Sequence, residues 1–168
     1  MDRAACLEYQ VTHFDKTFDQ GKLQMGQIEK IVWDEFVNQF GSRYERIGEN
    51  VPVWMEHPEK PAAVVASERR LVSPPSYRID AIAGDSKCVE LIEVKEIGNM
   101  TAIGQLLTYR MLYNRCYWGY ERLSMRLVCL RAPPTISFAC ERLEIEVTEL
   151  GAIVDHLIGA VRKGRKGI

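Results

Sequence analysis

An acid and an amine lie inside a strongly apolar stretch of the sequence, at Glu93 and Lys95. The surrounding segment, residues 88–95, is rich in Val, Leu and Ile and is typical of a strand buried on both faces. Side chains two residues apart on a strand point to the same face, so the two charged groups are expected side by side. Because an unpaired buried charge is costly, the pair needs compensating neighbours.

The preceding segment supplies a second acid, Asp80. Residues 77–83 are predicted to form a strand and residues 84–87 a turn, which makes a β-hairpin with residues 88–95. Two carboxylates on one face, with no His or Cys beside them, form an oxygen-rich site that suits Mg²⁺ or Mn²⁺. A nearby lysine could then stabilise a metal-bound hydroxide or the charge of a phosphoryl transition state.

The pairing of this hairpin decides whether the two acids meet. If Ala83 pairs with Cys88, Asp80 lies opposite Leu91 and one diagonal step from Glu93. Diagonal neighbours are roughly 7–8 Å apart at the backbone, close enough for both acids to bind one ion. The alternative is a structural ion pair between Lys95 and either acid, in a half-exposed sheet.

Two predicted helices carry further polar residues. Residues 23–40 have apolar residues at steps of three and four, and Glu29 falls on that apolar stripe. It is therefore either part of a site on the sheet or a boundary residue paired with a lysine. Residues 101–113 form the second helix, in which Gln105 and Tyr109 share one face. Alone, this pair also fits a solvated Gln and a Tyr at the edge of the core.

The remaining pattern predicts one α/β domain over residues 1–168, with a mixed central sheet flanked by helices and a core over about 23–161. Further strands are predicted at 44–56, 123–130 and 143–147, an extended piece at 62–75, a closing helix at 149–161 and a basic tail at 162–168. Residues 1–20 show no clear periodicity.

Composition excludes several classes of protein. The chain has 168 residues and a net charge of −1, so it is not a strongly basic nucleic-acid-coating protein. No signal peptide or membrane span is evident. The five cysteines include no close pair, which argues against a zinc site and a disulfide framework. We therefore expect a cytoplasmic protein with reduced thiols and no membrane partner.

Asp80 followed by Glu93-Val94-Lys95 resembles the signature of the PD-(D/E)XK nuclease superfamily. Glu29 is similar to the acid on the first helix of that superfamily. Gln105 and Tyr109 resemble the Gln-x-x-x-Tyr motif of its RecB-like and related exonuclease branches. The resemblance covers about residues 26–130 and implies a restriction-endonuclease-like αβββαβ core.

The function implied by this resemblance is metal-dependent hydrolysis of DNA phosphodiester bonds. The implied catalytic residues are Asp80, Glu93, Lys95, Gln105 and Tyr109, and the implied ligands of Mg²⁺ or Mn²⁺ are Glu29, Asp80, Glu93 and the carbonyl of Val94. Lys95 would position the attacking water, while Gln105 and Tyr109 would orient the substrate strand or the active-site side chains. The alternative is a catalytically inactive nucleic-acid-binding or assembly protein on the same fold.

Features that would bind the nucleic acid are sparse. Basic residues that could form a rim are Arg69, Arg70, Arg78, Lys87, Arg110, Arg115 and the tail at 162–166. Charges scattered in this way more often form a solvated face. Trp33, Trp54 and Trp118 are expected in the core or an interface. Because the chain is neutral, a homodimer that joins two basic patches is a natural way to hold a duplex.

Overall fold

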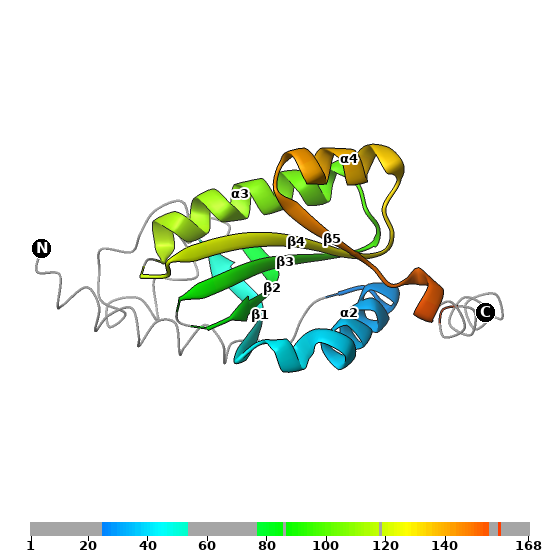
Figure 1. Ribbon diagram of the computed structural model, residues 1–168, viewed down its shortest axis with the longest axis horizontal. Helices are drawn as coiled ribbons and strands as arrows, with labels where there is room; N and C mark the ends of the chain where they lie inside the picture. The colour runs from blue at the N-terminus through cyan, green and yellow to red at the C-terminus, as the bar shows by residue number, and fades with distance from the viewer. Residues whose placement is uncertain (1–24, 54–76, 86, 118, 155–157, 159–168) are drawn as a thin grey trace, which may run out of the picture.

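The chain folds around a five-stranded mixed sheet with helices on both faces (Figure 1). The computed structural model describes residues 25–53, 77–85, 87–117, 119–154 and 158. The elements in chain order are α2 (Gln27–Phe40), the 3₁₀ helix η1 (Gly41–Arg43), β1 (Arg46–Val53), β2 (Tyr77–Gly84), β3 (Cys88–Ile97), α3 (Met100–Cys116), β4 (Arg122–Arg131), α4 (Pro134–Arg142) and β5 (Ile145–Glu149). The fold is therefore α/β, as predicted.

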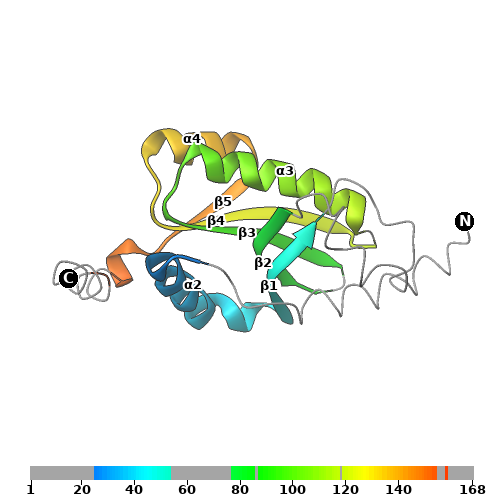
Figure 2. The ribbon, with the colours of Figure 1, turned by 180° about the vertical axis from the view of Figure 1, so that it is seen from behind.

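The strands lie in sequence order across the sheet, β1-β2-β3-β4-β5. β1, β2 and β3 are antiparallel neighbours, whereas β3, β4 and β5 are parallel. Parallel neighbours need a crossover, and α3 and α4 supply the two crossovers on one face of the sheet. α2 covers the opposite face (Figures 1 and 2).

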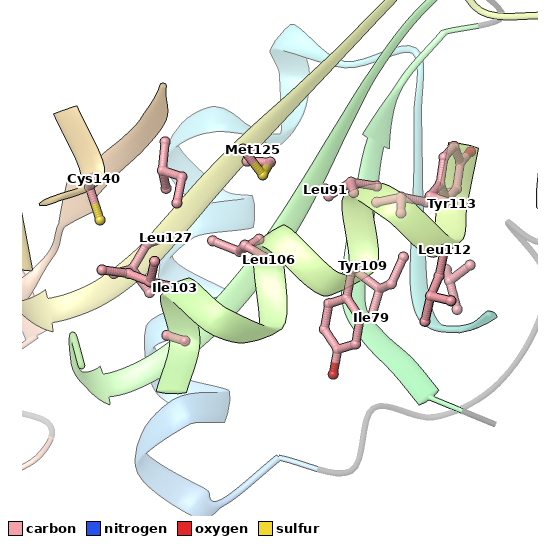
Figure 3. Packing of buried hydrophobic residues seen from close by; sticks show 14 of the residues in the cluster. Ile79, Leu91, Ile103, Leu106, Tyr109, Leu112, Tyr113, Met125, Leu127 and Cys140 are labelled. Atoms are coloured by element: carbon pink, nitrogen blue, oxygen red, sulfur yellow. The ribbon is translucent and has the colours of Figure 1, made fainter. Parts of the chain in front are cut away.

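Three apolar clusters form the core of the described residues, and two of them fill most of the space between the helices and the sheet, while the third joins Ile28 of α2 to Val154 and Ile158. The α3 cluster joins α3 and α4 to one face of the sheet, and Figure 3 shows Ile103, Leu106 and Tyr109 among its side chains, together with Leu91 and Met125 of the strands. The α2 cluster joins α2 to the other face. Burial of both faces explains why β3 reads as a continuous apolar run.

The predicted elements correspond closely to the observed ones, but η1 and α4 are not predicted, and the closing helix begins at residue 151 instead of 149, because Glu149 ends β5. The sequence pattern predicts no helix over residues 134–142, which form α4. This helix is short, and only Ile136 and Cys140 are buried, so it lacks a clear periodic pattern. The predictions for residues 1–20, 54–56, 62–75, 155–157 and 159–168 lie outside the described residues. None of the described helices is long and apolar enough to cross a membrane.

The predicted register of the β2–β3 hairpin is wrong by one residue on each strand. Gly84 pairs with Val89, not Ala83 with Cys88. The Asp85 carboxylate accepts hydrogen bonds from the N–H groups two and three residues further on, at 2.6 and 2.7 Å, and so begins the turn later. Gly84 permits this turn, since its φ is +140° and a Cβ would lie 2.0 Å from the carbonyl oxygen of Cys88.

Partway along β1 and β2, the side chains that pack against the helices switch from one face of the sheet to the other, and we call this the exchange of faces. Ile47 and Ala81 pack with the α2 cluster, whereas Val51 and Ile79 belong to the α3 cluster. Strict alternation would keep residues 47 and 51 on one face, and likewise residues 79 and 81. Asn50 lies at the exchange and has a φ of 55°.

Candidate functional site

Three charged side chains of β2 and β3 meet beside the exchange of faces. Lys95 Nζ contacts Glu93 Oε1 and lies 3.9 Å from Asp80 Oδ2. The same Asp80 oxygen accepts a hydrogen bond from the Val94 N–H at 2.9 Å. The structure thus brings the two predicted acids and the predicted lysine together.

Asp80, Glu93 and Lys95 are close together even though the predicted register of the hairpin is wrong. A shift of one residue on each strand moves the pairing by two positions in all, which keeps the same side chains on the same face. By extension of the observed pairs, Asp80 comes level with Glu93 instead of one diagonal step away. The two carboxyl groups therefore come closer together than the sequence predicted.

Glu93 is the most deeply buried charged side chain of this group. Its side chain is 0% exposed, and its Oε2 atom has no hydrogen-bond partner among the described residues. Burial and the charge on Asp80 raise the pKa of Glu93 to about 8, with a smaller contribution from Glu29, although Lys95 opposes the shift. The carboxyl group is therefore protonated at neutral pH in the free protein, and a cation would bind it in competition with that proton.

The other two groups respond to the same environment. Burial raises the pKa of Asp80 above its usual value, against the effect of the Val94 N–H and of Lys95. Burial alone would lower the pKa of Lys95, but the charges on Glu93 and Asp80 outweigh it and raise the pKa. Lys95 is therefore a permanent ammonium group at physiological pH.

Glu29 approaches the site from the first turn of α2. Its Oε2 atom accepts a hydrogen bond from the Gly26 N–H at 3.1 Å, which helps to begin the helix. Its negative charge raises the pKa values of Asp80, Glu93 and Lys95. Glu29 is thus a third acid whose field acts on the site, although the structure shows no direct contact between it and the other acids.

Gln105 and Tyr109 form a hydrogen-bonded pair on α3. Asn99 caps this helix by accepting a hydrogen bond from the Ala102 N–H at 3.0 Å, and Gln105 Nε2 donates to the Tyr109 hydroxyl at 3.1 Å. In Figure 3 that hydroxyl points away from the apolar cluster. Burial raises the pKa of Tyr109 and the charge on Glu93 adds to the rise, so the ring lies within the field of the site.

Few of the described residues near this cluster could bind a metal ion. Within the part of the chain that the structure describes, no three His, Cys, Asp or Glu side chains converge closely enough to hold one. The near oxygens are those of Asp80 and Glu93, to which the backbone carbonyl of Val94 could add. Two carboxylates suit Mg²⁺, which keeps several waters and takes other ligands from phosphates. The open oxygen of Glu93 fits such an ion.

The basic residues do not surround this site evenly. Lys87 lies in the turn before β3, six residues before Glu93 and roughly 20 Å away, and pairs with Glu121 at 3.3 Å. Arg78 lies closer, two residues before Asp80, and its Nη1 donates to the carbonyl of Asn50 at 3.0 Å. Arg110 and Arg115 lie on α3. The predicted contributions of Arg69, Arg70 and residues 162–166 lie outside the described residues.

Trp33 belongs to the core, as predicted. It is 1% exposed, stacks on Phe36 at 5.6 Å between ring centroids and donates to Glu49 Oε1 at 2.7 Å. It cannot serve as a stacking platform for bases in this conformation. Trp54 and Trp118 lie outside the described residues.

The described cysteine side chains are free thiols. Cys88 is exposed, whereas Cys129 and Cys140 are buried in the α3 cluster. This agrees with the predicted reduced state for these three positions. Burial raises the pKa of Cys129 to about 11, so its thiol is unreactive at neutral pH.

A polar network on the α2 face was not predicted. Glu90 accepts hydrogen bonds from the Tyr44 hydroxyl at 2.6 Å and from Arg126 Nε and Nη2 at 2.9 and 3.0 Å. Arg126 Nη1 also donates to Thr148 Oγ1 at 2.8 Å. The sequence signal that could have indicated this network is the presence of Glu90 and Arg126 inside two otherwise apolar strands. The network joins β3, β4 and β5 and lies on the opposite face from Glu93, so it is structural.

No family model, curated protein or solved structure matches the chain. The fold defines an α/β protein with a five-stranded mixed sheet. The site defines a cluster of one buried acid, Glu93, and the half-buried Asp80 around Lys95. Function must therefore be inferred from the chemistry of this cluster.

Proposed function

We propose that the chain is a Mg²⁺- or Mn²⁺-dependent nuclease of the PD-(D/E)XK type, which hydrolyses phosphodiester bonds in DNA. The observation that carries the proposal is Glu93, whose fully buried carboxyl group has one oxygen without a donor among the described residues. Burying such a group costs several kcal/mol unless a partner compensates it. Lys95 contacts only the other oxygen, so without metal the carboxyl group holds a proton near neutral pH, and a bound cation would take the place of that proton.

The order of the elements supports the same proposal. α2, β1, β2, β3, α3 and β4 follow one another as in the αβββαβ core that the resemblance implies. Asp80 lies on β2, Glu93 and Lys95 lie on β3, and Gln105 and Tyr109 lie on the helix that follows. These are the elements on which the matching motifs are expected.

Asp80 and Glu93 would hold the ion, with the carbonyl of Val94 and the charge of Glu29 in support. When bound, the ion would neutralise charge on the phosphate and supply an activated water. Its charge would also lower the pKa of Glu93, so that the carboxyl group ionises as a ligand at neutral pH.

Lys95 would act as a hydrogen-bond donor in this reaction. Because its pKa is raised, it cannot accept a proton from the attacking water near pH 7. It can orient that water or stabilise the negative charge that develops on the phosphate. The Tyr109 hydroxyl accepts a hydrogen bond from Gln105 and would donate its own proton to the substrate strand.

A structural ion pair accounts less well for the same contacts. One lysine faces two near acids and the field of a third, so the cluster can ionise fully only when a cation binds, and without one Glu93 keeps its proton up to about pH 8. Buried pairs in proteins are normally compensated more completely.

We further propose that the nuclease is cytoplasmic and that a homodimer joins two basic patches. A monomer in light scattering, with and without DNA, would refute the dimer.

The test is cleavage of labelled single-stranded, blunt duplex, flapped and four-way DNA with Mg²⁺, Mn²⁺ or EDTA. Glu93→Ala and Lys95→Ala are compared with the wild type. Lys87→Ala is the matched control, because it removes a lysine from the far end of the same hairpin. We expect metal-dependent cleavage in the wild type and in the control, and none with Glu93→Ala.

The outcomes separate nuclease from binding protein. Cleavage that needs metal and disappears with Glu93→Ala supports the proposal. DNA binding without cleavage of any substrate, together with no metal binding in calorimetry, indicates an inactive nucleic-acid-binding protein. Cleavage that Glu93→Ala leaves unchanged would place the active site elsewhere.

A further inference from the structure

Asn50 has a left-handed backbone conformation directly beside Asp80. Its φ is 55°, in the region that most side chains avoid. The paired ladder of β1 and β2 joins Glu49 to Ala81 and Val51 to Ile79, so the level between these pairs is that of Asn50 and Asp80. The distorted residue of β1 therefore faces the acid of β2.

The distortion coincides with the exchange of faces. Ile79 is buried in the α3 cluster, on the same face of the sheet as Leu91. Glu93 is two residues after Leu91 and shares that face. In a regular strand, burial of Ile79 under α3 would turn Asp80 toward α2 and away from Glu93. Because of the exchange of faces, the side chains of Ile79 and Asp80 can both lie on the α3 face of the sheet.

We infer that Asn50 is a positioning residue for Asp80. Its left-handed conformation lets β1 follow the change of face in β2 without loss of register, and this holds the Asp80 carboxylate against the Val94 N–H. Arg78 ties the two strands together at this level through its hydrogen bond to the Asn50 carbonyl, at 3.0 Å. The effect on Asp80 is independent of the proposed function, whereas the effect on catalysis rests on it.

The choice of residue agrees with this role. Among residues with a Cβ, asparagine tolerates the left-handed region best, and a β-branched residue is strongly disfavoured there. Glycine adopts the same conformation without cost. Substitutions can therefore separate the backbone conformation of Asn50 from its side chain.

The experiment follows the Val94 amide in ¹H–¹⁵N spectra of the full chain. A hydrogen bond to a carboxylate shifts the amide proton downfield, and Asp80→Ala supplies the shift expected when that bond is lost. We expect the Val94 amide proton of Asn50→Gly to keep its wild-type chemical shift. In Asn50→Val, we expect that shift to move toward the value measured in Asp80→Ala. Glu144→Val is the matched control, because Glu144 has a φ of 56° and is exposed at the end of α4, away from the site.

Each result decides the inference. A wild-type chemical shift of the Val94 amide proton in Asn50→Val would overturn the inference. It would also be overturned if Asn50→Gly changed that shift as much as Asn50→Val does, since the side chain of Asn50 and not its backbone conformation would then be responsible. If Asn50→Val does not fold, the milder Asn50→Ala is compared with Asn50→Gly in the same way.

Activity gives a second measurement. We expect Asn50→Val to lose about 10-fold or more in kcat, because a displaced ligand misplaces the reacting groups. Asn50→Gly and Glu144→Val should keep the wild-type rate. If no DNA is cleaved by any variant, the proposed function fails while the amide measurement still tests the inference.

Discussion

Glu93→Gln removes the group with the largest expected effect of pH on stability. The glutamine keeps the shape of the side chain but cannot ionise. In the folded protein the pKa of Glu93 is raised from 4.5 to about 8 by burial and by the charge on Asp80. The variant therefore tests whether these acids repel each other in the folded state.

The sign and the size follow from proton linkage. Between pH 4.5 and 8 the folded chain holds a proton on Glu93 that the unfolded chain has lost, so the free energy of unfolding falls as pH rises through this window. A difference of 3.5 pKa units (8 − 4.5) corresponds to about 5 kcal/mol as an upper limit. Above the folded pKa, near pH 8, the decline ends. The raised pKa of Asp80 acts in the same direction.

The assay is urea denaturation from pH 5 to 9 at constant ionic strength, without divalent metal. We expect the stability of the wild type to fall by several kcal/mol more than that of Glu93→Gln over this range. Glu141→Gln, an exposed substitution on α4, is the control and should follow the wild type. Parallel curves for the wild type and Glu93→Gln would refute the raised pKa and the buried-acid cluster with it.

Three further predictions concern metal, packing and rate. Mg²⁺ should raise the thermal midpoint of the wild type more at pH 8.5 than at pH 6, because the ion competes with the proton on Glu93, and a variant with Asp80→Asn and Glu93→Gln should show no rise. Arg126→Met should lower the free energy of unfolding by about 3 kcal/mol in urea, since it leaves the buried Glu90 carboxylate without its positively charged partner. Tyr109→Phe should reduce the rate of DNA cleavage with little change in the thermal midpoint, because it removes a hydroxyl at the edge of the core and leaves the ring in place.

The candidate site could be predicted from the sequence because its parts are local. Glu93 and Lys95 share a strand, so the two-residue period alone places them together. Asp80 belongs to the neighbouring strand of the same hairpin, and a register error of one residue on each strand leaves its face unchanged. Tyr109 and Gln105 are one helical turn apart, which the helical period also fixes.

What could not be predicted depends on contacts between distant parts of the chain. The left-handed conformation of Asn50 gives no periodic signal, and the exchange of faces interrupts the alternation from which strands are recognised. The partnership of Glu90 with Arg126 needs the parallel pairing of β3 with β4, which the sequence alone does not specify. The turn at Asp85 was readable in principle, because aspartate after glycine favours an Asx turn.

The hairpin that carries Asp80, Glu93 and Lys95 also has a consequence for the order of folding. β2 and β3 are joined by a short turn, so their pairing requires little loop-closure entropy. β4 reaches β3 only after the long crossover through α3, which is a contact of much higher sequence separation. The charged groups can therefore assemble early while they are still in water. Docking of β4 and α3 then removes that water, and this late step must bear the cost of burying Glu93.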